Sequence, residues 1–128
     1  MRNAAPLVLI FIAALPSAAG ADVSAAAKHA KSGEFEAAGE VRCAQEVGQS
    51  LGTCGAKVAR ASGSAAVVVT FPNGFSRTLT FSDGKFLRGN ATMSGVGTDT
   101  DWRLDGGFFN VRVDDQRFEL PETLVFGE

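Results

Sequence analysis

The chain contains two cysteines, Cys43 and Cys54, and their chemistry decides how the rest of the sequence is interpreted. A closed zinc site needs about four thiolate or imidazole ligands, whereas these cysteines are accompanied by a single histidine. A redox-active pair is usually a Cys-x-x-Cys motif with an activated thiol, and the separation here is much longer. Residues 1–21 have the features of a signal peptide, and an even number of cysteines in an exported protein normally forms disulfides. We therefore predict a structural Cys43–Cys54 disulfide.

Asp99, Asp101 and Asp105 form the densest acidic cluster in the sequence. Two carboxylates are enough for glycoside hydrolysis, and carboxylate oxygens also bind Ca²⁺. However, these residues alternate with Trp102 and Leu104, which places them on the solvent-facing side of a predicted strand. Nothing there raises a carboxyl pKa into the catalytic range, and the spacing departs from that of a calcium loop. We therefore predict no catalytic residues, no metal site and no cofactor, so the protein is not expected to be an enzyme.

Other sequence features also argue against catalysis and nucleic-acid binding. The only histidine, His29, lies in an alanine-rich N-terminal segment where we expect it to be exposed, so a Ser/His/Asp arrangement is not predicted. No Gly-x-x-x-x-Gly-Lys-Ser/Thr loop is present. The formal net charge is −2 and the basic residues are scattered, which is atypical of a nucleic-acid or anionic-membrane binder. The expected partner is an unknown protein or cell-envelope ligand.

A long segment of small residues, "NATMSGVGTD", is the first candidate for such binding. Exposed loops held by a rigid scaffold often carry function, although the same composition also suits a flexible turn. The candidate binding residues in and after this loop are Ser94, Gly95, Asp99, Asp101 and Trp102.

Arg77 and Arg88 are the second candidate, as interface residues. Arg77 shares the parity of Phe75 and Leu79 on a predicted strand, and Arg88 shares that of Phe86. A cation on an apolar face needs a buried or interfacial partner, or else extends its charged end into solvent at a sheet edge. The sequence favours the sheet edge and leaves the interface open.

From residue 34 onward, short runs of β-branched and aromatic residues are separated by Gly, Asn and Asp, a pattern typical of β-strands. Asn73-Gly74 predicts a hairpin with a type I′ turn between strands 65–71 and 75–82. Along the second of these strands, Phe75, Leu79 and Phe81 are expected to be buried and the intervening Ser and Thr residues solvated. The other expected strands cover residues 34–43, 53–61, 85–94, 98–105, 108–113 and 117–121, with an apolar segment at 123–127.

Successive hairpins predict an all-β domain, an antiparallel meander that forms either a small barrel or a two-layer sandwich. The predicted disulfide joins the first two strands. We expect no helix after residue 33, and the phenylalanines, valines and Trp102 are sufficient to fill one core. The predicted organisation is a signal peptide at 1–21, a tether or short helix at 22–33, and the β domain at 34–128.

The N-terminal segment has the features of a signal peptide. Arg2 precedes an apolar run over 4–15, Pro16-Ser17 interrupts it, and Ala19-Gly20-Ala21 is a small-x-small cleavage sequence before Asp22. The apolar run is shorter than the roughly 20 residues of a membrane-spanning helix. We therefore predict a periplasmic or secreted protein that is not stably inserted in the membrane after cleavage.

The pattern "GEVRCAQ", "GQSLGTC", "VVVTFPNGFSRTLTF" and "VDDQRFELPETLVFG" resembles a group of small exported proteins of Gram-negative bacteria, which implies the same location and fold but no activity. In a weaker likeness, "ATMSGVGTDTDW" is similar to the loop of periplasmic C-type lysozyme inhibitors. Those proteins are small β-barrels that insert a Ser-Gly loop into the lysozyme cleft. The likeness implies that Ser94 and Gly95 would act in that way, although the spacing to Trp102 differs.

Overall fold

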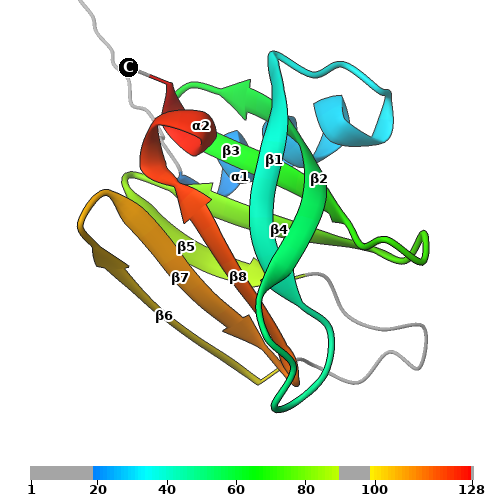
Figure 1. The fold of residues 1–128 in the computed structure, drawn as a ribbon. Coiled ribbons are helices and arrows are strands. Elements are labelled where there is room, and N and C mark those ends of the chain that lie inside the picture. The colour runs from blue at the N-terminus through cyan, green and yellow to red at the C-terminus, as the bar shows by residue number, and fades with distance from the viewer. Residues whose placement is uncertain (1–18, 90–98, 128) are drawn as a thin grey trace, which may run out of the picture.

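The computed structural model describes residues 19–89 and 99–127. Within these ranges eight strands form one antiparallel sheet in the order β5-β4-β3-β2-β1-β8-β7-β6 (Figure 1). The strands are β1 (Ala37–Ala44), β2 (Gly52–Ala61), β3 (Ser64–Thr70), β4 (Ser76–Ser82), β5 (Lys85–Gly89), β6 (Thr100–Asp105), β7 (Phe108–Val113) and β8 (Gln116–Pro121). Two runs of hairpins, β1–β5 and β6–β8, are therefore joined where β1 pairs with β8. The predicted all-β meander is confirmed.

The sheet curls until it is nearly closed into a barrel, which decides between the barrel and sandwich alternatives (Figure 1). The edge strands β5 and β6 are not neighbours in the hydrogen-bonded order, so side-chain packing brings the two ends of the sheet together. Gly89 on β5 faces Val113 on β7, and a Cβ atom built on Gly89 would lie 3.0 Å from both γ-methyl carbons of Val113. A residue with a side chain would fit here only if Val113 moved by a few tenths of an ångström.

Replacing Gly89 with valine should therefore lower the free energy of unfolding by about 1–3 kcal/mol, because the added methyl groups must displace Val113. Gly55→Val is the matched control, since Gly55 also lies on a strand but a Cβ atom added there would meet nothing within 4 Å. Urea unfolding measures both variants. Equal losses of stability would contradict closure of the barrel through the contact between Gly89 and Val113.

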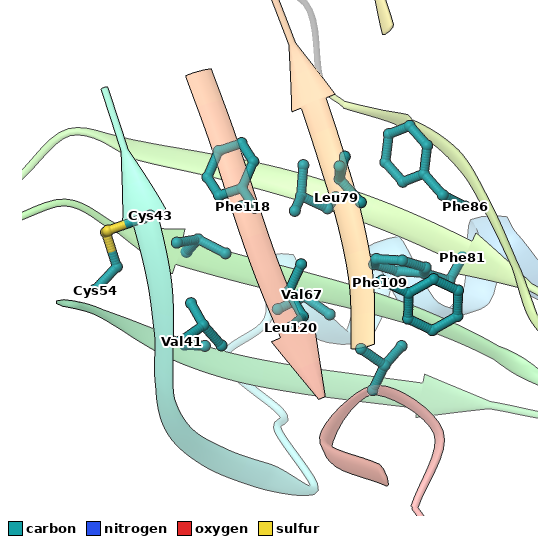
Figure 2. Packing of buried hydrophobic residues seen from close by; sticks show 14 of the residues in the cluster. Val41, Cys43, Cys54, Val67, Leu79, Phe81, Phe86, Phe109, Phe118 and Leu120 are labelled. Carbon is teal, nitrogen blue, oxygen red and sulfur yellow. A yellow bond between two sulfur atoms is a disulfide. The ribbon is translucent and has the colours of Figure 1, made fainter. Parts of the chain in front are cut away.

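The inward-facing side chains of all the strands except β6 supply one continuous core (Figure 2). Alternation along β7 buries Phe109, Val111 and Val113, as predicted. The aromatic centre is Phe81, whose ring centroid lies 4.9 Å from that of Phe109 and 5.4 Å from that of Phe86. The largest fully buried side chains are Phe81, Phe109, Phe118, Leu79 and Leu120.

The segment predicted as a tether or short helix, 22–33, lies largely in the helix α1 (Ala19–Lys31), which begins within the predicted signal peptide. The helix packs on the outside of β2, β3 and β4 (Figure 1). Ala59, Ala66 and Thr80 lie side by side in the sheet register and point outward. They are nevertheless buried, together with Ala26 of the helix. The prediction that this face is solvated is therefore wrong at Thr80, because small side chains on both surfaces let the helix lie close to the sheet.

The apolar segment at the C-terminus forms a short helix, α2 (Glu122–Phe126), so the expectation of no helix after residue 33 is wrong. Val125 is fully buried, and the Phe126 ring lies 6.1 Å from that of Phe109. Arg60 of β2 donates from Nη2 to the Leu124 carbonyl at 2.7 Å and from Nε to the Val125 carbonyl at 3.1 Å. A cation placed at the last carbonyls of a helix satisfies its unpaired acceptors.

The hairpin between β3 and β4 is confirmed, but its turn is not type I′. The Phe71 N–H donates to the Phe75 carbonyl and the Gly74 N–H to the Phe71 carbonyl, both at 2.8 Å. Gly74 has φ 94°, whereas Asn73 is not among the residues with positive φ. The turn therefore has three residues, because the ring of Pro72 fixes its φ near the value of the first position of a type I turn.

Phe75 itself is not buried as the alternation along this strand predicts. Its side chain is 45 % exposed, whereas Leu79 and Phe81 are fully buried. Phe75 closes the turn and precedes the first residue of β4, Ser76. The prediction is wrong at this position because the other walls of the barrel do not extend over the tip of the hairpin.

Candidate functional site

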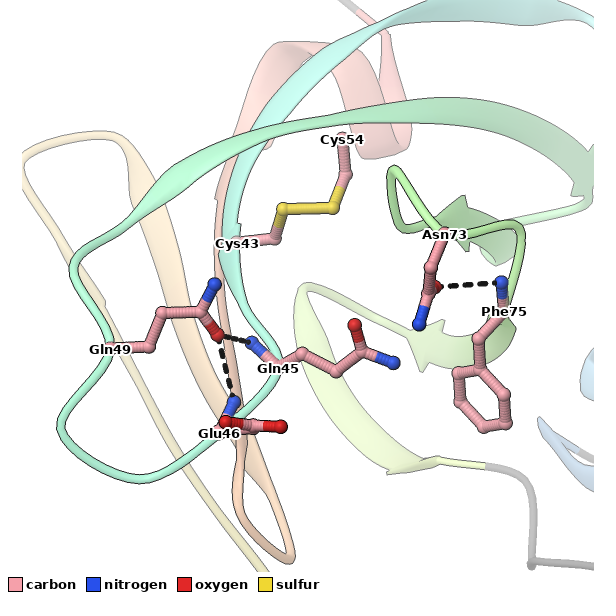
Figure 3. Close-up of a disulfide and its surroundings, with 7 residues drawn as sticks. All are labelled: Cys43, Gln45, Glu46, Gln49, Cys54, Asn73 and Phe75. Carbon is pink, nitrogen blue, oxygen red and sulfur yellow. Dashed lines mark hydrogen bonds between the residues drawn. A yellow bond between two sulfur atoms is a disulfide. The ribbon is translucent and has the colours of Figure 1, made fainter.

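The disulfide between Cys43 and Cys54 fixes the hairpin of β1 and β2 (Figure 3). The Cα atoms are 6.0 Å apart, and the pairing is diagonal, because Cys43 lies opposite Gly52 and Cys54 lies opposite Val41. Both cysteines are buried in the core. The predicted pairing is confirmed, and the bond restrains the ends of the connection between the two strands.

That connection, residues 45–51, is held in shape by one glutamine. Gln49 Oε1 accepts the backbone N–H groups of Gln45 at 2.7 Å and Glu46 at 3.0 Å (Figure 3). The carbonyl of Gln49 accepts a hydrogen bond from Nη2 of Arg117 on β8. The loop is thereby tied to the outside of β8, and its last residue, Leu51, lies at the edge of a cleft.

The cleft lies over β6, β7 and β8 and has a volume of about 520 Å³. Such a volume is within the range of small-molecule sites. Its lining combines guanidinium, carboxylate, amide and indole groups with a few apolar residues. The lining residues are Leu51, Asp101, Trp102, Arg103, Asn110, Val111, Arg112, Arg117, Phe118 and Glu119.

Strand register brings the polar residues of the cleft into two rows on the outside of the barrel. In the first row, Asp101 lies opposite Arg112, which lies opposite Arg117. These residues alternate along their strands with the inward-facing positions, so they share one face. The second row consists of Arg103, Asn110, Glu119 and Arg42, in that order across β6, β7, β8 and β1.

Several of these side chains have partners within the protein. Nη1 of Arg112 lies 3.4 Å from Oδ2 of Asp99 and donates to the Asp114 carbonyl at 3.0 Å. Asp101 accepts the backbone N–H of Trp102 at 2.9 Å. Arg103, by contrast, is exposed and its guanidinium has no partner among residues 19–89 and 99–127. Donor groups therefore remain for an external ligand.

Trp102 is half-buried between the cleft and the core. Its ring centroid lies 6.0 Å from that of Phe109 on one side, and the residue lines the cleft on the other. The sequence contains one tryptophan and no tyrosine. The tryptophan emission of the protein therefore comes from one residue, which contacts both the cleft and the core.

The residues predicted from the candidate binding loop are only partly assembled in this cleft. Asp101 and Trp102 line it, and Asp99 lies at its end through its ion pair with Arg112. Ser94 and Gly95 lie outside the described residues.

Arg77 points into the barrel from β4 and is only 4 % exposed. Its Nε donates to Oε1 of Gln116 on β8 at 2.8 Å, and its Nη2 lies 3.9 Å from Oδ2 of Asp114. Burial lowers the pKa of Arg77, and the charge of Asp114 opposes that shift. Because β4 and β8 are not neighbours in the sheet, Arg77 connects opposite walls of the barrel. Its position is inside the protein and away from an exposed surface.

Arg88 is exposed on the outside of β5 and lines a smaller hollow beneath α1, with Lys31 and Thr78. His29 of α1 is half-buried, which corrects the expectation of an exposed histidine. Its Nδ1 atom is buried without a hydrogen-bond partner in the described part of the chain. Neither residue belongs to the cleft.

The sequence interpretation missed most of the cleft. The residues not predicted from the sequence are Arg103, Asn110, Arg112, Arg117 and Glu119. The signal that could have found them was the polar alternation in "DWRLD", "FNVRV" and "QRFEL", which identifies an outer face on each strand. Alignment of these faces depends on the strand order, and the sequence did not reveal that order.

In the part of the chain that the structure covers, no three His, Cys, Asp or Glu side chains are grouped to hold a metal ion. Neither described helix is long and apolar enough to cross a membrane. Comparisons with protein-family models, curated proteins and solved structures give no match to this chain.

Proposed function

We propose that this protein is an exported, non-enzymatic binding module whose ligand contacts the cleft over β6, β7 and β8. The observation that carries the proposal is the lining itself: Trp102 shares one hollow with an amide, two carboxylates and the guanidinium of Arg103, which has no partner within residues 19–89 and 99–127. Sites that combine an apolar surface with a few convergent polar groups are typical of ligand recognition. The ligand is an envelope component or another protein of that compartment.

The carboxylates support binding more than catalysis. Asp99, Asp101 and Asp105 are all exposed, whereas a general acid is normally a carboxyl group held in a desolvated site. Asp101 is already an acceptor for a backbone N–H. These carboxylates are better suited to accepting hydrogen bonds from a ligand than to transferring protons.

Cross-linking in living cells tests the proposal. A photoreactive phenylalanine analogue at position 51, on the edge of the cleft, should form a covalent adduct with an envelope component on illumination. The control position is 87, because Leu87 is 41 % exposed but lies on β5, outside the cleft. Adducts at position 87 in place of position 51, or at neither, would contradict the proposal.

The exported state has its own test. Protein recovered from the periplasm should begin at Asp22 and have a mass two hydrogens below that of the reduced chain, because the leader is removed and Cys43 is bonded to Cys54. Intact-mass spectrometry before and after reduction measures both. An intact leader, or free thiols in freshly isolated protein, would contradict export.

Inhibition of C-type lysozyme is the second candidate function. It is supported by the barrel, which is the fold that the resemblance to those inhibitors implies, and by the position of Ser94 and Gly95 in the chain directly before β6, a cleft strand. The protein should then slow cell-wall lysis by a panel of C-type lysozymes, and Gly95→Trp should abolish the effect. Lysis at the full rate in the presence of excess protein would exclude this function.

A further inference from the structure

Four arginines lie on four neighbouring strands of the barrel and share its outer face. They are Arg103 on β6, Arg112 on β7, Arg117 on β8 and Arg42 on β1, and we call them the arginine track. Arg112 and Arg117 are directly opposite, and the other two are offset diagonally by two residues. With neighbouring strands about 4.8 Å apart, the track is about 14 Å long.

This arrangement opposes the charge of the chain as a whole. The formal net charge is −2, yet four arginines share a face with Asp101 and Glu119 in their rows and Asp99 at the end of the cleft. Like charges directly opposite on neighbouring strands are destabilising, and Arg112 and Arg117 form such a pair. Asp99 compensates part of this charge through its ion pair with Arg112, and Arg117 donates to the Gln49 carbonyl. An anionic ligand would add attraction to both guanidinium groups.

The guanidinium groups retain donors for that ligand. Arg103 has no side-chain partner among the described residues. The ion pair between Arg42 and Glu119 is long, at 3.7 Å, and its arginine side chain is 62 % exposed. Exposed pairs of this kind contribute little stability, so they exchange readily for a ligand. Arginine binds carboxylate and phosphate oxygens with two parallel hydrogen bonds.

The rest of the lining narrows the ligand class. Asp101 and Glu119 are unfavourable beside any row of anionic groups, but their oxygens accept hydrogen bonds from hydroxyl groups, which a sugar chain supplies and a polyphosphate lacks. Asn110 both donates and accepts, and Trp102 supplies an aromatic surface beside them. The guanidinium groups can bind acid groups, and the carboxylate and amide groups can bind hydroxyls. This combination fits an acidic sugar chain better than a nucleic acid.

We propose that the arginine track binds an anionic oligosaccharide, with the acid groups of successive sugars on Arg103, Arg112 and Arg117 and the hydroxyls on Asp101, Asn110 and Glu119. This inference rests on the proposed function and assigns a ligand class to the same cleft. Arg42 extends the track onto β1.

Titration of the oxidised protein with tetragalacturonate, followed by Trp102 emission and calorimetry, tests the inference. Maltotetraose supplies a neutral sugar chain and tripolyphosphate supplies oxyanions without sugar. Tetragalacturonate should bind, more weakly as salt is added, and the other two should not bind measurably. The triple variant Arg103→Gln/Arg112→Gln/Arg117→Gln should bind at least about tenfold more weakly. The matched control is Lys28→Gln/Lys57→Gln/Lys85→Gln, which removes the same charge from positions elsewhere and should bind like the wild type.

The outcomes separate this inference from the proposed function. Equal binding of tripolyphosphate would overturn the assignment to sugars, and undiminished binding by the folded arginine variant would overturn the assignment to the track. Failure of tetragalacturonate to bind, with cross-links still formed at position 51, would reject the ligand class and leave the binding function standing. Circular dichroism checks that each variant is folded. If the triple variant does not fold, the single variant Arg103→Gln is tested instead. The Arg103 side chain has no partner among the described residues, so its replacement breaks no contact there.

Discussion

Replacing Phe81 with alanine should lower the free energy of unfolding by about 3–5 kcal/mol, because it opens a cavity in a closely packed aromatic cluster. Phe81 is fully buried on β4, and its ring contacts those of Phe86, Phe109 and Phe126. These partners come from β5, β7 and α2. The side chain therefore joins elements from both halves of the chain, and urea unfolding at low temperature measures its contribution.

Phe108→Ala is the control for this prediction. Phe108 has the same side chain but is 41 % exposed on the outside of β7. Its replacement should cost less than about 1 kcal/mol, as is usual for surface positions. A loss at Phe81 no greater than that at Phe108 would mean that the barrel core is not packed as described.

Replacing both cysteines with alanine should lower the free energy of unfolding by about 3 kcal/mol, because the unfolded chain loses the restraint on its loop. Cys43 and Cys54 are 3 % and 2 % exposed, so alanine avoids burying the hydroxyl group that serine would introduce. The fold itself should persist, since the hairpin of β1 and β2 has its own backbone pairing.

Chemical denaturation of the double variant, beside wild-type protein with and without a reducing agent, measures the effect. The reduced wild type and the double variant should have similar stabilities, both below that of the oxidised protein. Indistinguishable stabilities in all three samples would contradict a structural role for the disulfide. Reducing agent should leave the double variant unchanged, which controls for other effects of the reagent.

Much of the barrel could be predicted because its strands carry local signals. The alternation of Phe109, Val111 and Val113 identifies both the strand and its buried face. Asp83 and Gly84 both have positive φ in the turn between β4 and β5, and Asp-Gly is one of the pairs that favour this type of two-residue turn. The disulfide pairing could be predicted because two cysteines allow only one pairing.

The cleft could not be predicted because it depends on contacts distant in sequence. Pairing of β1 with β8 brings Arg42 beside Glu119, and nothing local to either strand specifies that neighbour. The same pairing places β6, β7 and β8 next to the loop at 45–51, which supplies Leu51. Sequence alternation identified the solvent-facing residues of each strand but not which of them would meet.

Helix α1 and Arg77 show a second limit of prediction from the sequence, which concerns burial. Thr80 has the parity and polarity of a solvated residue, but α1 covers it because Ala59 and Ala66 leave room. Arg77 has a charged side chain yet lies inside the barrel, where Gln116 and Asp114 compensate its burial. In both cases a contact with a residue distant in sequence decides whether the side chain is buried. The polar and apolar pattern of one strand does not identify that residue.

The most direct test of the proposed binding role of the cleft uses Trp102, the one tryptophan in the sequence. Incorporation of 5-fluorotryptophan gives one ¹⁹F resonance, from Trp102, which can be observed in crude envelope fractions. Addition of such a fraction should shift or broaden this resonance saturably in the wild-type protein, and much less in the triple arginine variant. A resonance that stays unchanged at every concentration, while the protein is captured by the same fraction, would show that the ligand binds elsewhere and would contradict the cleft as the binding site.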